Sequence, residues 1–280
     1  MPQLIYKYGD VRAIDVIDRL RLKVTPPNHF NDPFEFTPQM APDLLYKTAF
    51  RHVLDEEGMQ EIYPEMIKNG QFSGSLAAFR EEIQRRTPTL TKALIETYPQ
   101  TAEDFRRRFI NMISETFGVI CLSNICDDVL MWGHYANCHT GMVIGFASGH
   151  DFWRRPQLQQ VEYTTKRAMF DPNIELDDPQ YRAQTRAIVR CKSSHWAYEQ
   201  EWRQLRLLAE CAAESGNDNL NYYVPIPADL ISRVILGFRF SSERRVQLES
   251  ILSQPEFDHV ELHEACLHER EFRLVISRLR

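Results

Sequence analysis

The sequence has few cysteines, and none of them follows the patterns that mark zinc ribbons or disulfide frameworks. Six cysteines are spread over 280 residues, and no two of them form a C-x-x-C pair. Zinc ribbons and small disulfide-stapled domains place their cysteines at short, characteristic spacings. We therefore expect free thiols in a reducing cytoplasm, and neither a structural zinc site nor a disulfide framework.

Long apolar runs and a strong charge of one sign are also missing. No stretch approaches the roughly 20 apolar residues that a membrane helix needs, and the first residues lack the apolar core of a signal peptide. The formal net charge of -6 gives no global basic field for nucleic acid or for an anionic membrane. Only a local basic groove stays open, because Arg106, Arg107 and Arg108 are adjacent. We expect a soluble, cytoplasmic protein without a membrane partner, of unspecified oligomeric state.

What is present is the pattern of a globular α+β protein. Hydrophobic residues make up 43% and charged residues 26%, which is ordinary for a folded domain. Apolar runs predict strands of one sheet, or of two packed sheets, at 4–8, 119–123, 142–146 and 202–208. Further strands are expected near 158–163, 220–225, 231–236 and 271–277, and helices near 178–190 and 241–252. Helical spacing over 41–117 predicts an all-helical insertion. Because a regular βαβ rhythm is absent, we expect a single α+β domain over 1–280 with a mostly antiparallel sheet core.

Three short segments concentrate the residues that could form a site, and the first is 28–36. Asn31 and Asp32 before Pro33 favour a turn, and flanking phenylalanines would fix that turn to a core. Two interpretations are open. The segment is a rigid, well-capped loop, or Asn31, Asp32 and Glu35 form a polar rim at the mouth of a cleft.

The second segment, 121–146, places hydrogen-bonding aromatic residues between two apolar strands. Trp132, His134, Tyr135 and His139 are the candidates for a ligand pocket there. On a helix the two histidines would point about 140° apart, so they do not form a helical metal pair and no metal site is expected. The alternative for each histidine is a hydrogen-bonded core residue. We predict that His134 and Tyr135 are largely buried and that His134 is hydrogen-bonded within the protein, with the 28–36 loop as one candidate partner.

The third segment, 192–206, places aromatic residues and two carboxylates at the start of a predicted strand. Glu199 and Glu201 are two residues apart, so an extended backbone would put both side chains on one face. Two carboxylates held together raise the pKa of one of them, which suits acid-base chemistry or the stabilisation of a cation. The alternative is a solvated surface pair, matched in charge by Lys192, Arg203 or Arg206.

These segments carry a resemblance to the bacterial domain-of-unknown-function family 2971. The motifs that carry it are FNDPFE at 30–35, LMWGHYA at 130–136, HTGMVIGF at 139–146, WAYEQEWR at 196–203 and ISRVILG at 231–237, after an opening with Tyr6, Lys7 and Tyr8. The ordered set spans nearly the whole chain. The family name itself implies no activity.

The chain also resembles ADP-ribosyltransferases, more distantly. Those enzymes have a split, mostly antiparallel sheet with a polar or aromatic residue on the first strand, a serine or aromatic residue on a middle strand, and a glutamate entering a late strand. Tyr6 to Tyr8, Ser123 and Glu201 occur here in that order, with Lys7 where the superfamily usually carries His or Arg.

This second resemblance implies NAD as the substrate. Glu201 would bind the nicotinamide ribose and stabilise the oxocarbenium-like charge that develops as nicotinamide leaves. Glu199 would orient or deprotonate the acceptor, and an aromatic ring would stack on the nicotinamide. The residues expected to contact the nucleotide are Tyr6, Tyr8, Ser123, Trp132, His134, Tyr135 and Tyr198.

Three functions therefore compete. The first is an NAD-consuming transferase that acts on an unidentified protein or nucleic acid, as a toxin or phage-defence effector. The second is a hydrolase or nuclease that uses His134, His139 and a carboxylate. The third is a non-catalytic module that binds a nucleotide or a protein through the same aromatic cleft.

Overall fold

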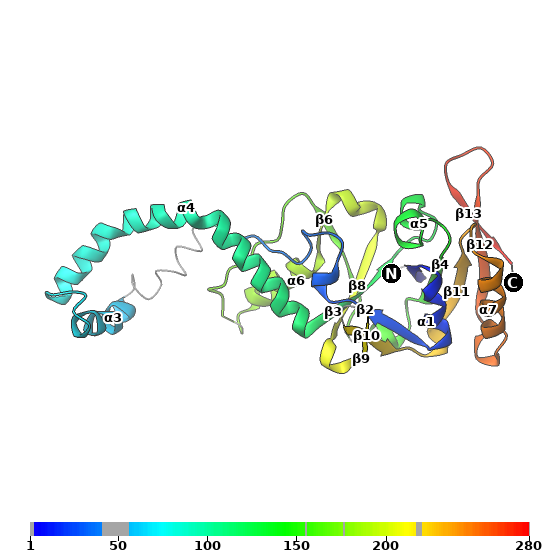
Figure 1. Ribbon diagram of the computed structural model, residues 1–280, viewed down its shortest axis with the longest axis horizontal. Coiled ribbons are helices and arrows are strands. Elements are labelled where there is room, and N and C mark those ends of the chain that lie inside the picture. Colours follow the sequence, from blue (N-terminus) through cyan, green and yellow to red (C-terminus); the bar gives the residue numbers. More distant parts are fainter. Residues whose placement is uncertain (1–2, 41–55, 155, 176, 217–219, 280) are drawn as a thin grey trace. The chain divides into compact units, whose positions relative to one another are not determined.

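The computed structural model describes residues 3–40, 56–154, 156–175, 177–216 and 220–279 (Figure 1). The chain divides into two compact units. The first unit comprises residues 1–35, 111–166 and 190–280, and the second comprises 36–110 and 167–189. The single-domain organisation expected from the sequence stays a prediction.

The first unit contains an eight-stranded, mostly antiparallel sheet. Its order is β13-β12-β11-β4-β1-β3-β8-β5, and only β11 and β12 pair in parallel. The strands are β1 (Leu4–Gly9), β3 (Phe117–Ser123), β4 (Met142–Ala147), β5 (Gln159–Gln160), β8 (Glu201–Leu207), β11 (Ile231–Leu236), β12 (Glu261–Leu267) and β13 (Leu274–Arg278). All four strands predicted for the core, β1, β3, β4 and β8, lie in this one sheet, and the α+β fold class is confirmed.

Two smaller sheets complete the strands of the first unit. One joins β2 (Arg21–Val24), β10 (Leu220–Pro225) and β9 (Ala212–Ser215), and the other pairs β6 (Glu162–Thr164) with β7 (Cys191–Ser193) in parallel. Although β1 and β3 are neighbours in the large sheet, a single residue pair, Tyr6 opposite Ser123, joins them. The sheet is therefore split at this point, whereas β1 and β4 pair over six positions.

Helices cover both faces of the large sheet because its central strands are apolar on both sides. On β4, Ile144 and Phe146 pack into one core with α1 (Ile14–Asp18) and α7 (Ser242–Leu252). Val143 faces the other way and packs with Met131 and Trp132 of α5 (Val129–Tyr135). A strand buried on both faces gives a continuous apolar run, which is why β4 could be predicted from the sequence.

Capping and close backbone packing fix the position of α5. Asp128 caps the helix, with its carboxylate accepting a hydrogen bond from the Met131 N–H at 2.9 Å. After the helix, three consecutive non-glycine residues, 137–139, adopt left-handed backbone conformations. Gly141 then passes so close to the Gly9 carbonyl that an added Cβ would lie 2.1 Å from its oxygen. Only glycine fits this junction between α5 and β4.

The second unit is helical in its described part. It contains α3 (Glu56–Lys68), most of α4 (Leu76–Thr116) and most of α6 (Pro179–Arg190). The rings of Phe105, Phe109 and Phe170 pack together with centroids 5.2 to 5.8 Å apart. No strand occurs between 56 and 116, as predicted, while 41–55 lie outside the described residues. None of the described helices is long and apolar enough to cross a membrane.

Candidate functional site

A cavity of about 390 Å³ opens in the first unit, where the large sheet splits. Its volume falls in the range of small-molecule pockets. The 28–35 loop, β1, β3, α5 and the segment 192–201 supply its walls. The lining residues are Tyr6, Lys7, Tyr8, Thr25, His29, Phe30, Asn31, Glu35, Cys121, Leu122, Ser123, Met131, His134, Tyr135, Lys192, Glu199 and Glu201.

Three of these residues are aligned across neighbouring strands. Tyr6 of β1 is paired with Ser123 of β3, and Ser123 is paired with Glu201 of β8. Directly opposed residues share one face of a sheet, so the three side chains lie in a row along one face. Lys7 lies beside this row, and its ammonium donates to the Cys121 carbonyl across the split at 3.0 Å. Burial raises the pKa of Tyr6 to about 12, so its phenol stays neutral.

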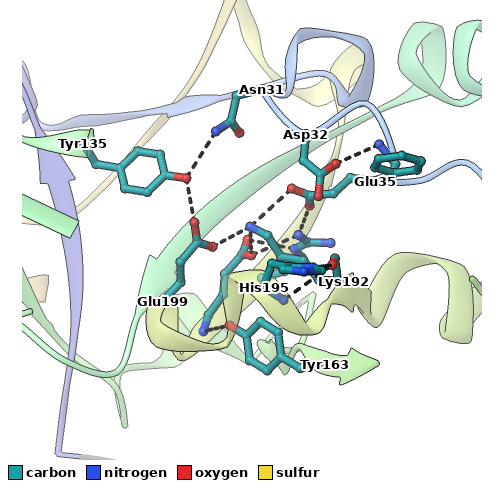
Figure 2. A network of polar contacts seen from close by, with 12 residues as sticks. Asn31, Asp32, Glu35, Tyr135, Tyr163, Lys192, His195 and Glu199 are labelled. Carbon is teal, nitrogen blue, oxygen red and sulfur yellow. Dashed lines mark hydrogen bonds and ion pairs between the residues drawn. The ribbon is translucent and has the colours of Figure 1, made fainter. Parts of the chain in front are cut away.

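A buried ammonium ion lies at the centre of the polar wall. Lys192, on β7, is 5% exposed, and its Nζ lies 2.5 Å from Glu199, 2.8 Å from Glu201 and 3.2 Å from Glu35 (Figure 2). Burial by itself would lower the pKa of Lys192, but the three carboxylates raise it above its ordinary value. The side chain is therefore a permanent cation.

Arg203 supplies the second cation. Its side chain is fully buried, forms an ion pair with Glu35, and donates to Glu201 at 2.8 Å and 3.0 Å. Burial would raise the pKa of Glu201, but the charges of Arg203 and Lys192 outweigh it and lower that pKa to about 2. For Glu35 burial dominates, and its pKa is raised. Glu201 therefore stays ionised at all physiological pH values.

A phenol connects Glu199 to the mouth of the cavity. The Tyr135 hydroxyl donates to the Glu199 carboxylate at 2.6 Å and accepts a longer contact of 3.4 Å from the Asn31 amide (Figure 2). Burial, followed by the hydrogen bond to Glu199, raises the pKa of Tyr135. Behind the cluster, the Tyr163 hydroxyl accepts from the backbone N–H of Glu201 at 2.8 Å. Both carboxylates therefore have fixed positions.

The two glutamates converge by a different route from the predicted one. Glu199 ends a short 3-10 helix (Ser194–Glu199), and Gln200 adopts a left-handed conformation with φ 45 before β8 begins at Glu201. The segment from Glu199 to Glu201 is not extended, so the prediction that both side chains lie on one face of a strand is wrong. Both carboxylates nevertheless reach Lys192, because the backbone reverses at Gln200.

The alternative interpretation, a solvated surface pair of carboxylates, is also wrong, because both glutamates are buried. Glu199 is 3% and Glu201 4% exposed. Lys192 and Arg203 are partners of these glutamates, as that interpretation held, but Arg206 binds Gln204 and the Phe152 carbonyl. Glu35 joins the same cluster and lines the cavity with Asn31, as the rim interpretation expects. Asp32 does not line the cavity, because its buried carboxylate accepts a hydrogen bond from the Phe34 N–H within the loop.

The aromatic candidates separate into two groups. Tyr6, Tyr8, Tyr135 and His134 line the cavity together with Ser123. Trp132 does not, because its ring is fully buried and its N–H donates to the Cys126 carbonyl at 2.8 Å. Trp132 therefore cannot stack on a ligand, and the half-buried Tyr198 also lies outside the cavity lining.

The prediction that His134 is buried and hydrogen-bonded is wrong. The residue is exposed, and its ring lies beside the rings of Tyr135 and Tyr198, with 6.2 and 6.4 Å between centroids. No hydrogen bond of its side chain is seen among the described residues. Tyr135, one residue later on α5, makes the contact to the 28–36 loop instead. His139 stacks on Trp132 and is outside the cavity. No group of three or more His, Cys, Asp or Glu in the described part of the chain is placed to hold a metal ion.

Comparison with protein families gives one match. The sequence model described as "Protein of unknown function (DUF2971)" matches residues 131–204. The predicted resemblance to this family is confirmed over these residues, while the motifs at 30–35 and 231–237 lie outside the match. No curated protein and no solved structure matches. The DUF2971 segment begins in α5 and ends in β8, so it contains Tyr135, Lys192, both glutamates of E-x-E and Arg203.

Sequence reasoning missed the central role of Lys192, the ion pairs of Glu35 with Lys192 and Arg203, and the participation of Tyr163. The signal for Lys192 was the presence of a lysine seven residues before Glu199 in a segment rich in aromatic residues. Glu35 lies 168 residues before Arg203 in the chain. Spacing could not indicate that contact, because only the tertiary fold brings the two residues together.

Proposed function

We propose that the cavity binds NAD and that the protein is an ADP-ribosyltransferase-like enzyme. The observation that carries this proposal is the alignment of Tyr6, Ser123 and Glu201 on three adjacent strands, at the point where the sheet splits. These are the three motif positions that the resemblance to ADP-ribosyltransferases assigns. Glu201, the second glutamate of the Glu199-Gln200-Glu201 segment, lies directly opposite that serine and two strands from that tyrosine, which supports the proposal.

The electrostatics of Glu201 suit the reaction. Breaking the bond between nicotinamide and the ribose C1′ sends the bonding electrons to nicotinamide and leaves positive charge on the ribose. A fixed carboxylate at the cavity wall stabilises that charge, provided it is ionised. Because Lys192 and Arg203 lower the Glu201 pKa to about 2, Glu201 is ionised at any pH at which the protein works. It acts by charge and by hydrogen bonding to the ribose, and not as a general acid.

Glu199 and Tyr135 are placed for the second half of the reaction. An acceptor hydroxyl or amine that attacks C1′ must lose a proton, and Glu199 is the carboxylate that would take it. This role is supported by its link through Tyr135 to the exposed residue Asn31 of the cavity lining. With water as the acceptor the product is ADP-ribose. Tyr6, Tyr8 and Tyr135 supply aromatic surface for the nicotinamide, and Lys7 supplies a cation for the anionic part of NAD.

Nicotinamide release from NAD tests the proposal directly. We expect release by the wild-type protein and a loss of roughly 100-fold or more in turnover for Glu201→Gln, the scale of losing one electrostatic group in the transition state. Glu199→Gln should reduce transfer to an acceptor more than hydrolysis of NAD. The matched control is Glu162→Gln, because Glu162 is an exposed carboxylate on β6 that pairs with Arg190 at the end of α6.

Two results would count against the enzyme. Wild-type protein that releases no nicotinamide, with and without cell lysate as a source of acceptor, would remove the proposal. Binding of NAD or ADP-ribose without turnover would support the second candidate, a non-catalytic nucleotide-binding module. That candidate is favoured by one observation, that every carboxylate of the cluster already has a cationic partner. A role as a toxin or phage-defence effector depends on the acceptor that the lysate experiment identifies.

A further inference from the structure

Lys192 is the one residue of the cluster that contacts all three carboxylates. They come from separate places: Glu35 from the 28–35 loop, Glu199 from the end of the 3-10 helix, and Glu201 from the start of β8. Three carboxylates this close would repel one another without a cation between them. An ammonium group is compact and has three rotatable donors, whereas the planar fork of arginine suits paired oxygens on one side.

The position of this ammonium group is itself fixed. On the two-stranded sheet, Lys192 of β7 is paired with Tyr163 of β6, and the Tyr163 hydroxyl accepts from the Glu201 N–H. The ring of Trp196 lies 5.3 Å from the Lys192 ammonium. The side chain is 5% exposed and bound to three carboxylates, which holds the ammonium group in place.

The charges around the cluster make Lys192 indispensable to its arrangement. Glu35, Glu199 and Glu201 face two buried cations, Lys192 and Arg203, so the carboxyl groups outnumber the cations. Arg203 contacts Glu35 and Glu201, while the ammonium of Lys192 contacts Glu199 as well. Removing Lys192 would leave three carboxyl groups facing Arg203, and Glu199 would lose its ion pair at 2.5 Å while keeping the hydrogen bond from Tyr135.

We propose that Lys192 is the positioning residue of the site, whose ammonium holds Glu199 and Glu201 side by side at the cavity wall, directed at the ribose of the bound nucleotide. This inference rests on the proposed NAD chemistry for its functional consequence. Lys192 acts through the two carboxylates and takes no part in bond breaking.

Two substitutions separate the charge of Lys192 from its shape. Lys192→Met removes the charge, so the pKa of at least one carboxylate rises, and the acid limb of the turnover-against-pH profile moves up by about one pH unit or more. Turnover should fall roughly 10- to 100-fold, because the carboxylates are no longer held, while KM changes less. Lys192→Arg keeps the charge, so the acid limb stays in place while turnover falls only partly.

The experiment is nicotinamide release as a function of pH for the wild type, both Lys192 variants and a control. The control is Lys166→Met, which removes an exposed lysine close to β6 and should leave the profile unchanged. A purely structural Lys192 would lower turnover and stability in both variants without moving the acid limb, and that result would overturn the inference. If Lys192→Met does not fold, Lys192→Arg decides, because unchanged turnover in that variant would show that the three-way contact is dispensable.

A second measurement distinguishes failure of this inference from failure of the proposed function. Carboxyl carbon NMR of protein labelled at glutamate follows each titration without any substrate, and the Glu201 signal is assigned by its loss in Glu201→Gln. We expect the Glu201 titration to move to higher pH in Lys192→Met and to stay in place in Lys192→Arg. An unchanged Glu201 titration in Lys192→Met overturns the positioning role, whereas a wild type inert towards NAD with a shifted titration removes only the NAD chemistry.

Discussion

The stability of the first unit should depend on Arg203 more than on any exposed arginine. Arg203 is fully buried on β8, and it pairs with Glu35 and Glu201. Arg203→Met keeps much of the side-chain volume but leaves those two carboxylates with Lys192 as their sole shared cation. Breaking a buried ion pair by removing one partner destabilises proteins by about 3–5 kcal/mol, because the remaining charge stays buried. We expect a loss of that size at pH 7.

The pKa of Glu201 gives a second estimate of how much the ion pairs stabilise the folded protein. Lowering it from 4.5 to about 2 corresponds to roughly 3 kcal/mol of stability supplied by the ion pairs. Since the folded-state pKa is lowered, this stability is present above the unfolded pKa and is lost as pH falls from 4.5 towards 2. Glu35 has the opposite effect on the free energy of unfolding. Its folded-state pKa is raised, so its ionisation at higher pH lowers the stability of the folded protein. The deficit of Arg203→Met should therefore be largest at neutral pH and shrink as the pH falls below about 4.

Urea unfolding followed by tryptophan fluorescence measures this difference. All four tryptophans, at 132, 153, 196 and 202, lie in the first unit, so their emission reports on that unit alone. The matched control is Arg206→Met on the same strand, where Arg206 binds Gln204 and the Phe152 carbonyl, and a loss of about 1 kcal/mol is expected. An Arg203→Met protein as stable as the wild type at pH 7, or a deficit of equal size at pH 3 and pH 7, would refute the reasoning.

Two further predictions concern the placement of α5 beside the cavity. Asp128→Ala removes the cap of α5 and should lower the free energy of unfolding by about 1 kcal/mol, with Asp127→Ala as a neighbouring control, both measured by urea unfolding. Gly141→Ala brings a Cβ to 2.1 Å from the Gly9 carbonyl oxygen and should destabilise by about 1–3 kcal/mol or more. Gly133→Ala meets no atom within 4 Å inside α5, so it should be neutral or stabilising by up to about 1 kcal/mol, and similar melting temperatures for the two alanine variants would contradict the packing argument.

The elements of the fold that follow apolar periodicity could be predicted from the sequence. β3, β4 and β11 are short apolar runs, and the described helices between 56 and 116 follow the three-and-four spacing of an amphipathic chain. β12 was not predicted, because its sequence, ELHEACL, contains charged residues and has no continuous apolar run. β7 and β9 are too short to show a period. Local patterning therefore identifies the long elements, and pairing partners decide the short ones.

For the candidate site, the sequence by itself determined which segments matter. Turn chemistry, clustered aromatics and the E-x-E spacing marked 28–36, 121–146 and 192–206, and all three contribute to the cavity. The tertiary structure decided the rest. It buried Glu199 and Glu201 around Lys192, exposed His134 and placed Trp132 in the core. The physical reason is that burial and ion pairing depend on contacts between residues far apart in the chain, such as Glu35 and Arg203, which no local pattern encodes.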